Sequence, residues 1–198
     1  MNHNFRPAQL AVALFVLVAL APVPAPAQQR RYTPADVEFM QGMIGHHAQA
    51  IAMAALVSGR TTNQSIQTLA QRIDISQKDE IRLMQNWLED RGQTAPDPSM
   101  HMDHDSTGHE RLMPGMLTPD QMAQLAAAKD TAFDRLFLQF MIQHHQGALT
   151  MVKTLFASPG AAQATDTFRY ASGVDTDQRF EIERMQKMLD AMPGSHQS

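Results

Sequence analysis

Apolar side chains recur along the chain at the three- and four-residue spacing that places them on one face of an α-helix. Beyond residue 27, no stretch shows the alternation with a period of two that is typical of a strand. The pattern therefore predicts an all-α protein. Its four long helices are expected to run from Thr33 to about Ser58, from about Thr62 to Arg91, from Thr131 to about Ser158, and from about Ala161 to Ala191.

The chain contains an internal repeat. Residues 36–53 and 134–151, 98 positions apart, are identical at nine of 18 positions, and residues 69–89 and 170–190 share eight of 21. Each copy predicts a helical hairpin, and because a single hairpin leaves its apolar face in water, we expect two hairpins to close a four-helix bundle with approximate twofold symmetry. The predicted parts are a bundle over 28–192, made of repeat one (33–92), a loop (93–118) and repeat two (119–192), and a flexible tail over 193–198.

The first 27 residues predict a secretory signal peptide rather than part of the fold. Residues 10–21 form an uninterrupted apolar run of 12 residues, and Ala25 and Ala27 occupy the small-residue positions of a cleavage site. The run is too short to span a bilayer, which takes about 20 residues, so we expect cleavage after Ala27 and no membrane attachment afterwards. The mature protein is expected in the periplasm or outside the cell.

Composition narrows the chemistry. The chain has 15 Met, 9 His and no Cys, with a formal charge of -4. Without Cys, disulfides, cysteine-ligated zinc sites, iron–sulfur clusters and thiol nucleophiles are excluded, and the mild acidity argues against nucleic acid as a partner. No Glu is followed by His three residues later, as a di-iron bundle requires, and no hydrolase motif is present.

A Met-x-x-His-His-x5-Met motif is present in both repeats. Adjacent histidines point about 100° apart on a helix, so we expect one imidazole of each pair to face inward and its neighbour to reach a helix beside it. Burying imidazoles costs free energy unless their nitrogens find partners, which favours metal ligation, although Met at this spacing is equally typical of core packing. The predicted ligands are Met43, His46, His47 and Met53, with Met141, His144, His145 and Met151.

The second helix of each repeat adds a Gln-x2-Glu-x3-Met pattern. Met84 and Met185 join the predicted ligands, because each lies four residues after a glutamate on the same helical face. These glutamates, Glu80 and Glu181, are either outer acceptors that orient imidazole nitrogens or solvated surface residues. Two further outer-acceptor candidates precede the His-His motifs at matching positions, Asp36 and Asp134.

The loop between the repeats combines turn-forming residues with Met and His. In a flexible acidic segment, alternating thioethers and imidazoles are typical of a weak copper-scavenging tract, but the same composition also fits a disordered linker. A short helix is expected from Pro119 to about Lys129, since Thr118 and Gln121 have capping-box spacing. The candidate loop ligands are Met100, His101, Met102, His104, His109, Met113 and Met116.

In both halves, Phe-x3-Met-Ile-x-His-His-x2-Ala-x2-Met is followed by Gln-x2-Glu-Ile-x2-Met, and this combination resembles the domain of unknown function 305 family in its tandem form. The resemblance covers nearly all of the chain beyond the signal peptide. It implies a ferritin-like helical bundle, export, and copper binding as in the members that have a role. One departure is Met188, where repeat one has Trp87. By motif match, the functional positions are Met43, His46, His47, Met53, Met84 and their mates in repeat two.

Thioethers combined with imidazoles favour copper, above all Cu(I), over zinc or nickel. We therefore expect an exported protein that binds Cu(I) or Cu(II) for buffering, transport or resistance, with the metal ion and other copper-handling proteins as partners. The same residues also fit a metal-dependent oxidase or electron-transfer protein, or a metal-free helical interaction module. The sequence leaves the oligomeric state open.

Overall fold

The computed structural model describes residues 32–99 and 112–193, and every regular element in these ranges is a helix. The predicted all-α fold class is therefore confirmed. The predicted signal peptide, residues 100–111 of the Met/His loop and nearly all of the predicted tail lie outside the described residues. The helices are α1 (Pro34–Ala55), α2 (Gln64–Glu89), α3 (Pro119–Ala127), α4 (Asp130–Ala157) and α5 (Thr165–Asp190).

Local capping chemistry sets most of the helix starts. Thr33 caps α1 in a capping box with Asp36, and Thr118 caps α3 in a capping box with Gln121. Each cap is followed by a proline, whose missing N–H is harmless at the first helical position. Both starts agree with the sequence expectation.

Two helices begin later than their patterns suggest. Asn63, not Thr62, caps α2, and its side chain accepts a hydrogen bond from the Ser65 amide. The fourth long helix was expected from about Ala161 but starts at Thr165. The reason is the turn before it, where Gly160 and Ala162 both adopt positive φ and so interrupt any helical run.

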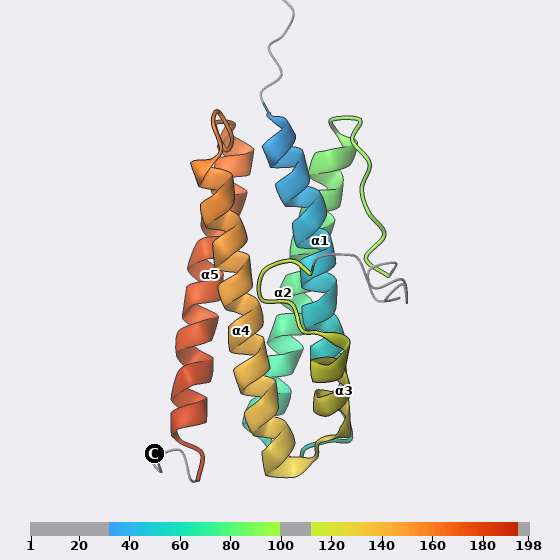
Figure 1. Cartoon of the computed structure of the whole chain (residues 1–198), viewed down its shortest axis with the longest axis vertical. Helices are drawn as coiled ribbons and strands as arrows, with labels where there is room; N and C mark the ends of the chain where they lie inside the picture. Colours follow the sequence, from blue (N-terminus) through green and yellow to red (C-terminus); the bar gives the residue numbers. More distant parts are fainter. Residues whose placement is uncertain (1–31, 100–111, 194–198) are drawn as a thin grey trace, which may run out of the picture. The chain divides into compact units, whose positions relative to one another are not determined.

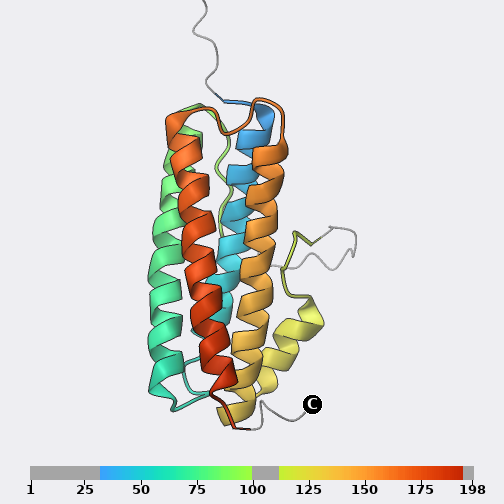
Figure 2. The ribbon, with the colours of Figure 1, turned by 90° about the vertical axis from the view of Figure 1, so that its left-hand side faces the viewer.

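The four long helices lie side by side, and neighbours run in opposite directions (Figures 1 and 2). Helix α1 packs along α2, α4 packs along α5, and the two hairpins meet mainly through α1 and α4. The short helix α3 packs against α4. Among the described residues, no helix is both long and apolar enough to cross a membrane.

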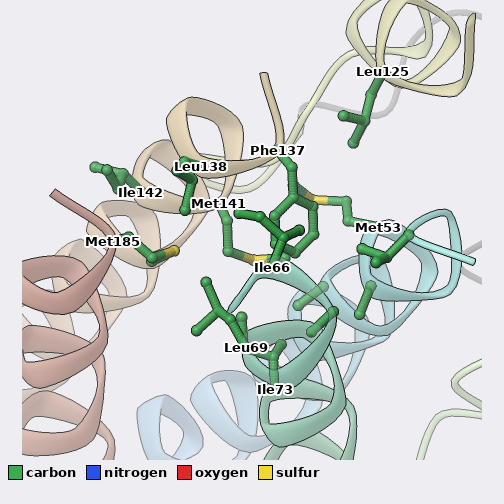
Figure 3. Close-up of a cluster of buried hydrophobic side chains, with 14 of the residues drawn as sticks. Met53, Ile66, Leu69, Ile73, Leu125, Phe137, Leu138, Met141, Ile142 and Met185 are labelled. Atoms are coloured by element: carbon green, nitrogen blue, oxygen red, sulfur yellow. The ribbon is translucent and has the colours of Figure 1, made fainter. Parts of the chain in front are cut away.

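Two apolar clusters fill the core, one on either side of its middle. Figure 3 shows one of them, in which Met53, Phe137 and Met141 pack with aliphatic residues of α2 and α4. The other gathers residues such as Met43 and Trp87 near the start of α1 and the end of α2. Between them lie the buried polar residues of the central turns, which are His46, His47, Gln77, His144, His145 and Gln178.

Asp36 and Asp134 connect each hairpin to the turn of the other one. Asp36 accepts hydrogen bonds from the Thr33 amide and from the Ala162 amide, each at 2.7 Å. Asp134 accepts one from the Asn63 side chain at 2.9 Å. Both carboxylates are buried, and their hydrogen bonds are with helix ends and turns rather than with imidazoles. Their observed contacts are therefore structural.

Candidate metal centre

The polar residues in the middle of the core form a layer that receives side chains from all four long helices. In the first hairpin, Nε2 of His47 lies 2.6 Å from Oε2 of Glu80. In the second, Nε2 of His145 lies 2.5 Å from Oε2 of Glu181. Both imidazoles are buried, whereas the glutamate side chains are 15% and 21% exposed. Each hairpin thus carries its own imidazole–carboxylate pair.

The other two histidines meet across the interface between α1 and α4. The ring centroids of His46 and His144 are 3.9 Å apart, with the ring planes inclined by 38°. Nε2 of His46 lies 2.9 Å from the Pro114 carbonyl oxygen, and Nε2 of His144 lies 3.0 Å from the His46 carbonyl oxygen. Because a carbonyl oxygen can only accept, both Nε2 atoms carry the hydrogen. Each neutral ring therefore keeps its lone pair on Nδ1.

The Nδ1 atoms of all four histidines are buried and have no hydrogen-bond partner among the described residues. The same holds for Oε1 of Gln77, one turn before Glu80 on α2. All five atoms are lone-pair acceptors when the imidazoles are neutral with hydrogen on Nε2. Buried polar atoms are normally satisfied. Several unpartnered lone pairs in one buried layer favour a bound cation or a water molecule.

Burial keeps the central imidazoles uncharged. It is the main cause that lowers the pKa of His46 from 6.5 to about 3, and the nearby His47 ring acts in the same direction. Burial likewise holds the pKa of His144 well below the usual value, again reinforced by the other imidazoles. Metal ligation requires the neutral imidazole. Burial therefore favours the neutral form of these two rings, which is the form that binds a metal ion.

The predicted thioether ligands differ in their distance along the helix from the polar layer and in their burial. Met43 and Met141 lie three and four residues before the histidines of their own helix, and Met84 and Met185 lie four residues after the paired glutamates, so all four flank the polar layer. All four are fully buried within the two apolar clusters, as is Met53, which lies farther along α1 beside Phe137 (Figure 3). Met151, the mate of Met53, is half-buried.

Carboxylates and imidazoles alone do not complete a chelating site. Within residues 32–99 and 112–193, no three His, Asp or Glu side chains are grouped closely enough to hold a metal ion. A metal centre in the polar layer therefore requires thioether ligands, a rotation of the imidazole rings, or both.

The loop ahead of α3 approaches the layer more closely than its sequence indicates. Residues 113–117, called the strap below, cross α1 and α4 at mid-height (Figure 1). The strap provides the Pro114 carbonyl that accepts the hydrogen bond from His46. Of the candidate loop ligands, Met113 and Met116 belong to the strap, whereas Met100, His101, Met102, His104 and His109 lie outside the described residues.

A cleft of about 380 Å³ opens beside Glu80, between α2 and α5. Its wall includes Trp87, Tyr170 and Asp177. The Tyr170 hydroxyl is buried without a hydrogen-bond partner among the described residues, and burial together with the Glu80 carboxylate raises its pKa well above the usual value. Burial and the carboxylates of Glu80 and Glu181 also raise the pKa of Asp177. The cleft thus connects solvent to the Glu80 carboxylate, and its lining combines apolar side chains with the carboxyl groups of Glu80, Asp166 and Asp177 and the Arg169 side chain.

Most of the chain matches one family model. That model, described as domain of unknown function (DUF305), covers residues 36–189. The chain belongs to the DUF305 family. The family assignment confirms the resemblance carried by the duplicated His-His motif, and both copies of the motif lie within the matched range.

Solved DUF305 structures share the fold. A DUF305 fragment from Deinococcus radiodurans is 32% identical, with a TM-score of 0.69 over 81% of this chain and 99% of the fragment. A DUF305 protein from Streptomyces coelicolor, provisionally named as secreted, is 28% identical, with a TM-score of 0.66 over 78% and 91% of the two chains. CopM in its Cu(II)-bound form is 26% identical, with a TM-score of 0.61 over 78% and 95%.

A shorter similarity extends to a viral protein. Protein L153 of Acanthamoeba polyphaga mimivirus is 41% identical over 56 residues, which is 28% of this chain and 37% of the viral one. The chain therefore matches little more than a third of the length of that relative, and the match concerns a single segment.

Proposed function

We propose that this DUF305 protein is exported and binds copper, with a preference for Cu(I), in order to buffer, carry or detoxify the metal. The observation that supports this most directly is the set of four buried Nδ1 atoms that have no hydrogen-bond partner in the described part of the chain. Each belongs to an imidazole whose Nε2 is already engaged by a carboxylate or a carbonyl. The second ring nitrogen is thus left to bind a metal ion.

The ligand chemistry selects the metal. Imidazole and thioether are the donors available in and around the polar layer, and soft thioethers favour Cu(I) over zinc or nickel. Of the predicted ligands, His46, His47, His144 and His145 would bind through Nδ1, with the thioethers of Met43, Met84, Met141 and Met185 closest along their helices. Glu80 and Glu181 would fix the ring orientation by accepting from Nε2, a role that outer ligands commonly have in metal sites.

Access and similarity also support a copper function. The cleft beside Glu80 gives a cation a route to the carboxylate that pairs with His47, and the related protein CopM has been crystallised with Cu(II) bound. Export rests on the predicted signal peptide over residues 1–27, and a related Streptomyces protein carries a provisional name as secreted.

The experiment is a Cu(I) titration of the full mature chain without oxygen, in competition with a chromophoric Cu(I) chelator. We expect His46→Ala/His47→Ala/His144→Ala/His145→Ala to lose the tightest site. The matched control, His101→Ala/His104→Ala/His109→Ala, removes imidazoles from the loop and should keep that site. Wild-type affinity and stoichiometry in the four-histidine variant would overturn the proposal, as would loss of the site in the loop control.

A second measurement does not depend on the folding of a variant. Nitrogen NMR of wild-type protein labelled in histidine distinguishes Nδ1 from Nε2. On addition of Ag(I), a redox-inert substitute for Cu(I), we expect the Nδ1 signals to move while the Nε2–H signals persist. Loss of the Nε2–H signals, with Nδ1 signals that do not move, would contradict ligation through Nδ1.

A further inference from the structure

One position breaks the symmetry of the two hairpins on the face crossed by the strap. The 98-residue repeat aligns Gly42 of α1 with Phe140 of α4, and Met53 with Met151. Phe140 packs against the apolar cluster that contains Met53. At the equivalent position of the first hairpin, Gly42 has no side chain and leaves the corresponding space on α1 open to other residues.

Two thioethers occupy the space at Gly42. A β-carbon placed on Gly42 would lie 3.3 Å from Sδ of Met113 and 3.4 Å from Cε of Met151. Met113 comes from the strap and Met151 from α4, so two methionines 38 positions apart converge on one spot of α1. Both are half-buried, unlike the fully buried methionines around the polar layer. Both residues are therefore partly open to solvent.

The strap that carries Met113 is fixed to the helices at several points. Gln49 donates to the Leu117 carbonyl at 3.0 Å and accepts from the Leu117 amide at 2.7 Å. The Pro114 carbonyl accepts from His46, and the strap lies so close to α4 that a β-carbon on Gly147 would be 1.9 Å from the Pro114 oxygen. Met113 therefore stands at one end of a held segment.

These attachments also depend on differences between the repeats. Gln49, which holds Leu117, is aligned with Gly147, which leaves room for Pro114. If both positions were glutamine, the strap could not lie against α4. If both were glycine, it would lose its hydrogen bonds to Gln49. The strap and the thioether pair at Gly42 thus both depend on residues that differ between the two repeats on the same face of the bundle.

We propose that Met113 and Met151 form an outer Cu(I) site at Gly42, separate from the buried histidine layer. The proposal rests on the copper chemistry proposed above but does not require the buried histidines to be ligands. Two thioethers select a soft monovalent ion and leave coordination positions open toward solvent. An open, half-exposed site suits exchange of the ion with donors from outside, whereas the enclosed layer suits retention.

The outer site is also connected to the layer. Met113 directly precedes Pro114, and the Pro114 carbonyl accepts the hydrogen bond that orients His46. An ion that draws the Met113 side chain toward Met151 acts on the same backbone segment. We therefore expect the His46 Nε2–H signal to shift when the outer site fills, before the Nδ1 signals of the layer respond.

The test must separate ligation from simple packing, because methionine also fills irregular spaces in apolar surroundings. We would follow the methyl signals of carbon-labelled methionine in the full mature chain during titration with Ag(I), and measure Cu(I) stoichiometry by chelator competition. The test variant is Met113→Leu/Met151→Leu. The matched control is Met122→Leu/Met188→Leu, which alters two half-buried methionines that pack beside the core.

We expect the Met113 and Met151 methyl signals to shift together, the test variant to lose one bound Cu(I) per chain, and the control to lose none. The two signals should still shift in His46→Ala/His47→Ala/His144→Ala/His145→Ala, so failure of the histidine layer would leave the outer site standing. Unchanged stoichiometry in the test variant, or methyl signals that do not move, would show that the pair only packs. Loss of the shifts in the histidine variant would overturn a separate site.

Discussion

The two hairpins, α1–α2 and α4–α5, have closely similar polar residues in the central layer. They differ on the face that the strap crosses. Each buries an imidazole against a mostly buried glutamate, at 2.6 Å in the first hairpin and 2.5 Å in the second. The central imidazoles differ in their acceptors, because His46 donates to the strap at Pro114 whereas His144 donates to the backbone of α1. The imidazole–glutamate pairs of the polar layer are thus alike in the two hairpins, whereas the backbone segments that accept from the central imidazoles differ.

The outer ends of the hairpins differ as well. Trp87 of α2 packs edge-on against Tyr32 at 5.5 Å, and the Arg91 guanidinium lies 4.2 Å from its ring centroid while pairing with Asp166 of α5. The aligned residue in α5 is Met188, which packs at the edge of the other apolar cluster. Residues at the ends of a bundle can therefore change to suit packing while the layer at its centre stays the same.

The largest effect is expected where one hairpin makes room for the strap. Gly147→Ala adds a β-carbon that would lie within 3 Å of three strap atoms, and these are backbone atoms that cannot rotate away. We expect a loss of about 3 kcal/mol in the free energy of unfolding, near the upper range for overpacking. Urea unfolding followed by circular dichroism measures it.

The control for this change is Gly173→Ala in α5, where an added β-carbon meets nothing within 4 Å. Because alanine is the better helix former, this variant should gain up to about 1 kcal/mol. A Gly147→Ala protein as stable as the Gly173→Ala protein would mean that the strap does not need its close approach to α4.

Sequence could predict the parts of this fold that depend on neighbouring residues. The starts of α1 and α3 follow from Thr-Pro pairs with an acceptor three residues after the cap. The start of α5 could not be predicted in this way, because Ala162 is held at positive φ where its amide donates to Asp36, 126 positions away. Such a contact leaves no local pattern.

The second prediction concerns the two carboxylates that tie the hairpins together. Asp36→Ala removes the acceptor of the Thr33 and Ala162 amides and leaves the buried Ala162 N–H without a partner. We expect it to cost about 2 kcal/mol. Asp134→Ala removes a bond to the Asn63 side chain, and the second oxygen of Asp134 has no partner among the described residues, so about 1 kcal/mol is expected. Thermal unfolding of both variants measures the difference, and equal losses would contradict it.

The candidate site shows the same division between local and distant causes. The spacing of adjacent histidines predicted that one ring of each pair faces inward and its neighbour reaches a second helix, and His47 and His145 do reach Glu80 and Glu181. No sequence pattern predicted that the Pro114 carbonyl would accept from His46, or that Met53 and Met151 would have different environments. Both features arise because the strap crosses the interface between α1 and α4 on one side only. The difference between Gln49 and Gly147, which are aligned in the repeat, could have indicated that the two hairpins are not packed alike. It could not have indicated which segment packs against them.

The smallest expected effect tests whether the two central imidazoles behave alike despite their different acceptors. Between pH 6.5 and about 3 the unfolded chain protonates His46 while the folded chain keeps it neutral, so the unfolded state binds more protons and stability falls as the pH is lowered. For metal-free protein, one fully shifted histidine contributes a slope of about 1.4 kcal/mol per pH unit. His144 should contribute in the same direction, since its pKa is also lowered.

The comparison is made on slopes rather than on absolute stability, which any core substitution alters. Urea unfolding of His46→Gln and of His144→Gln between about pH 4.5 and 6, where the unfolded imidazole is largely protonated, should give slopes that are each lower than wild type by about 1.4 kcal/mol per pH unit. Equal reductions would mean that burial, shared by both rings, sets their proton affinity and that the strap contributes little. If His144→Gln alone lowered the slope, the hydrogen bond from His46 to the Pro114 carbonyl would outweigh the burial of the His46 ring. The strap would then set the proton affinity of one central imidazole and not of the other.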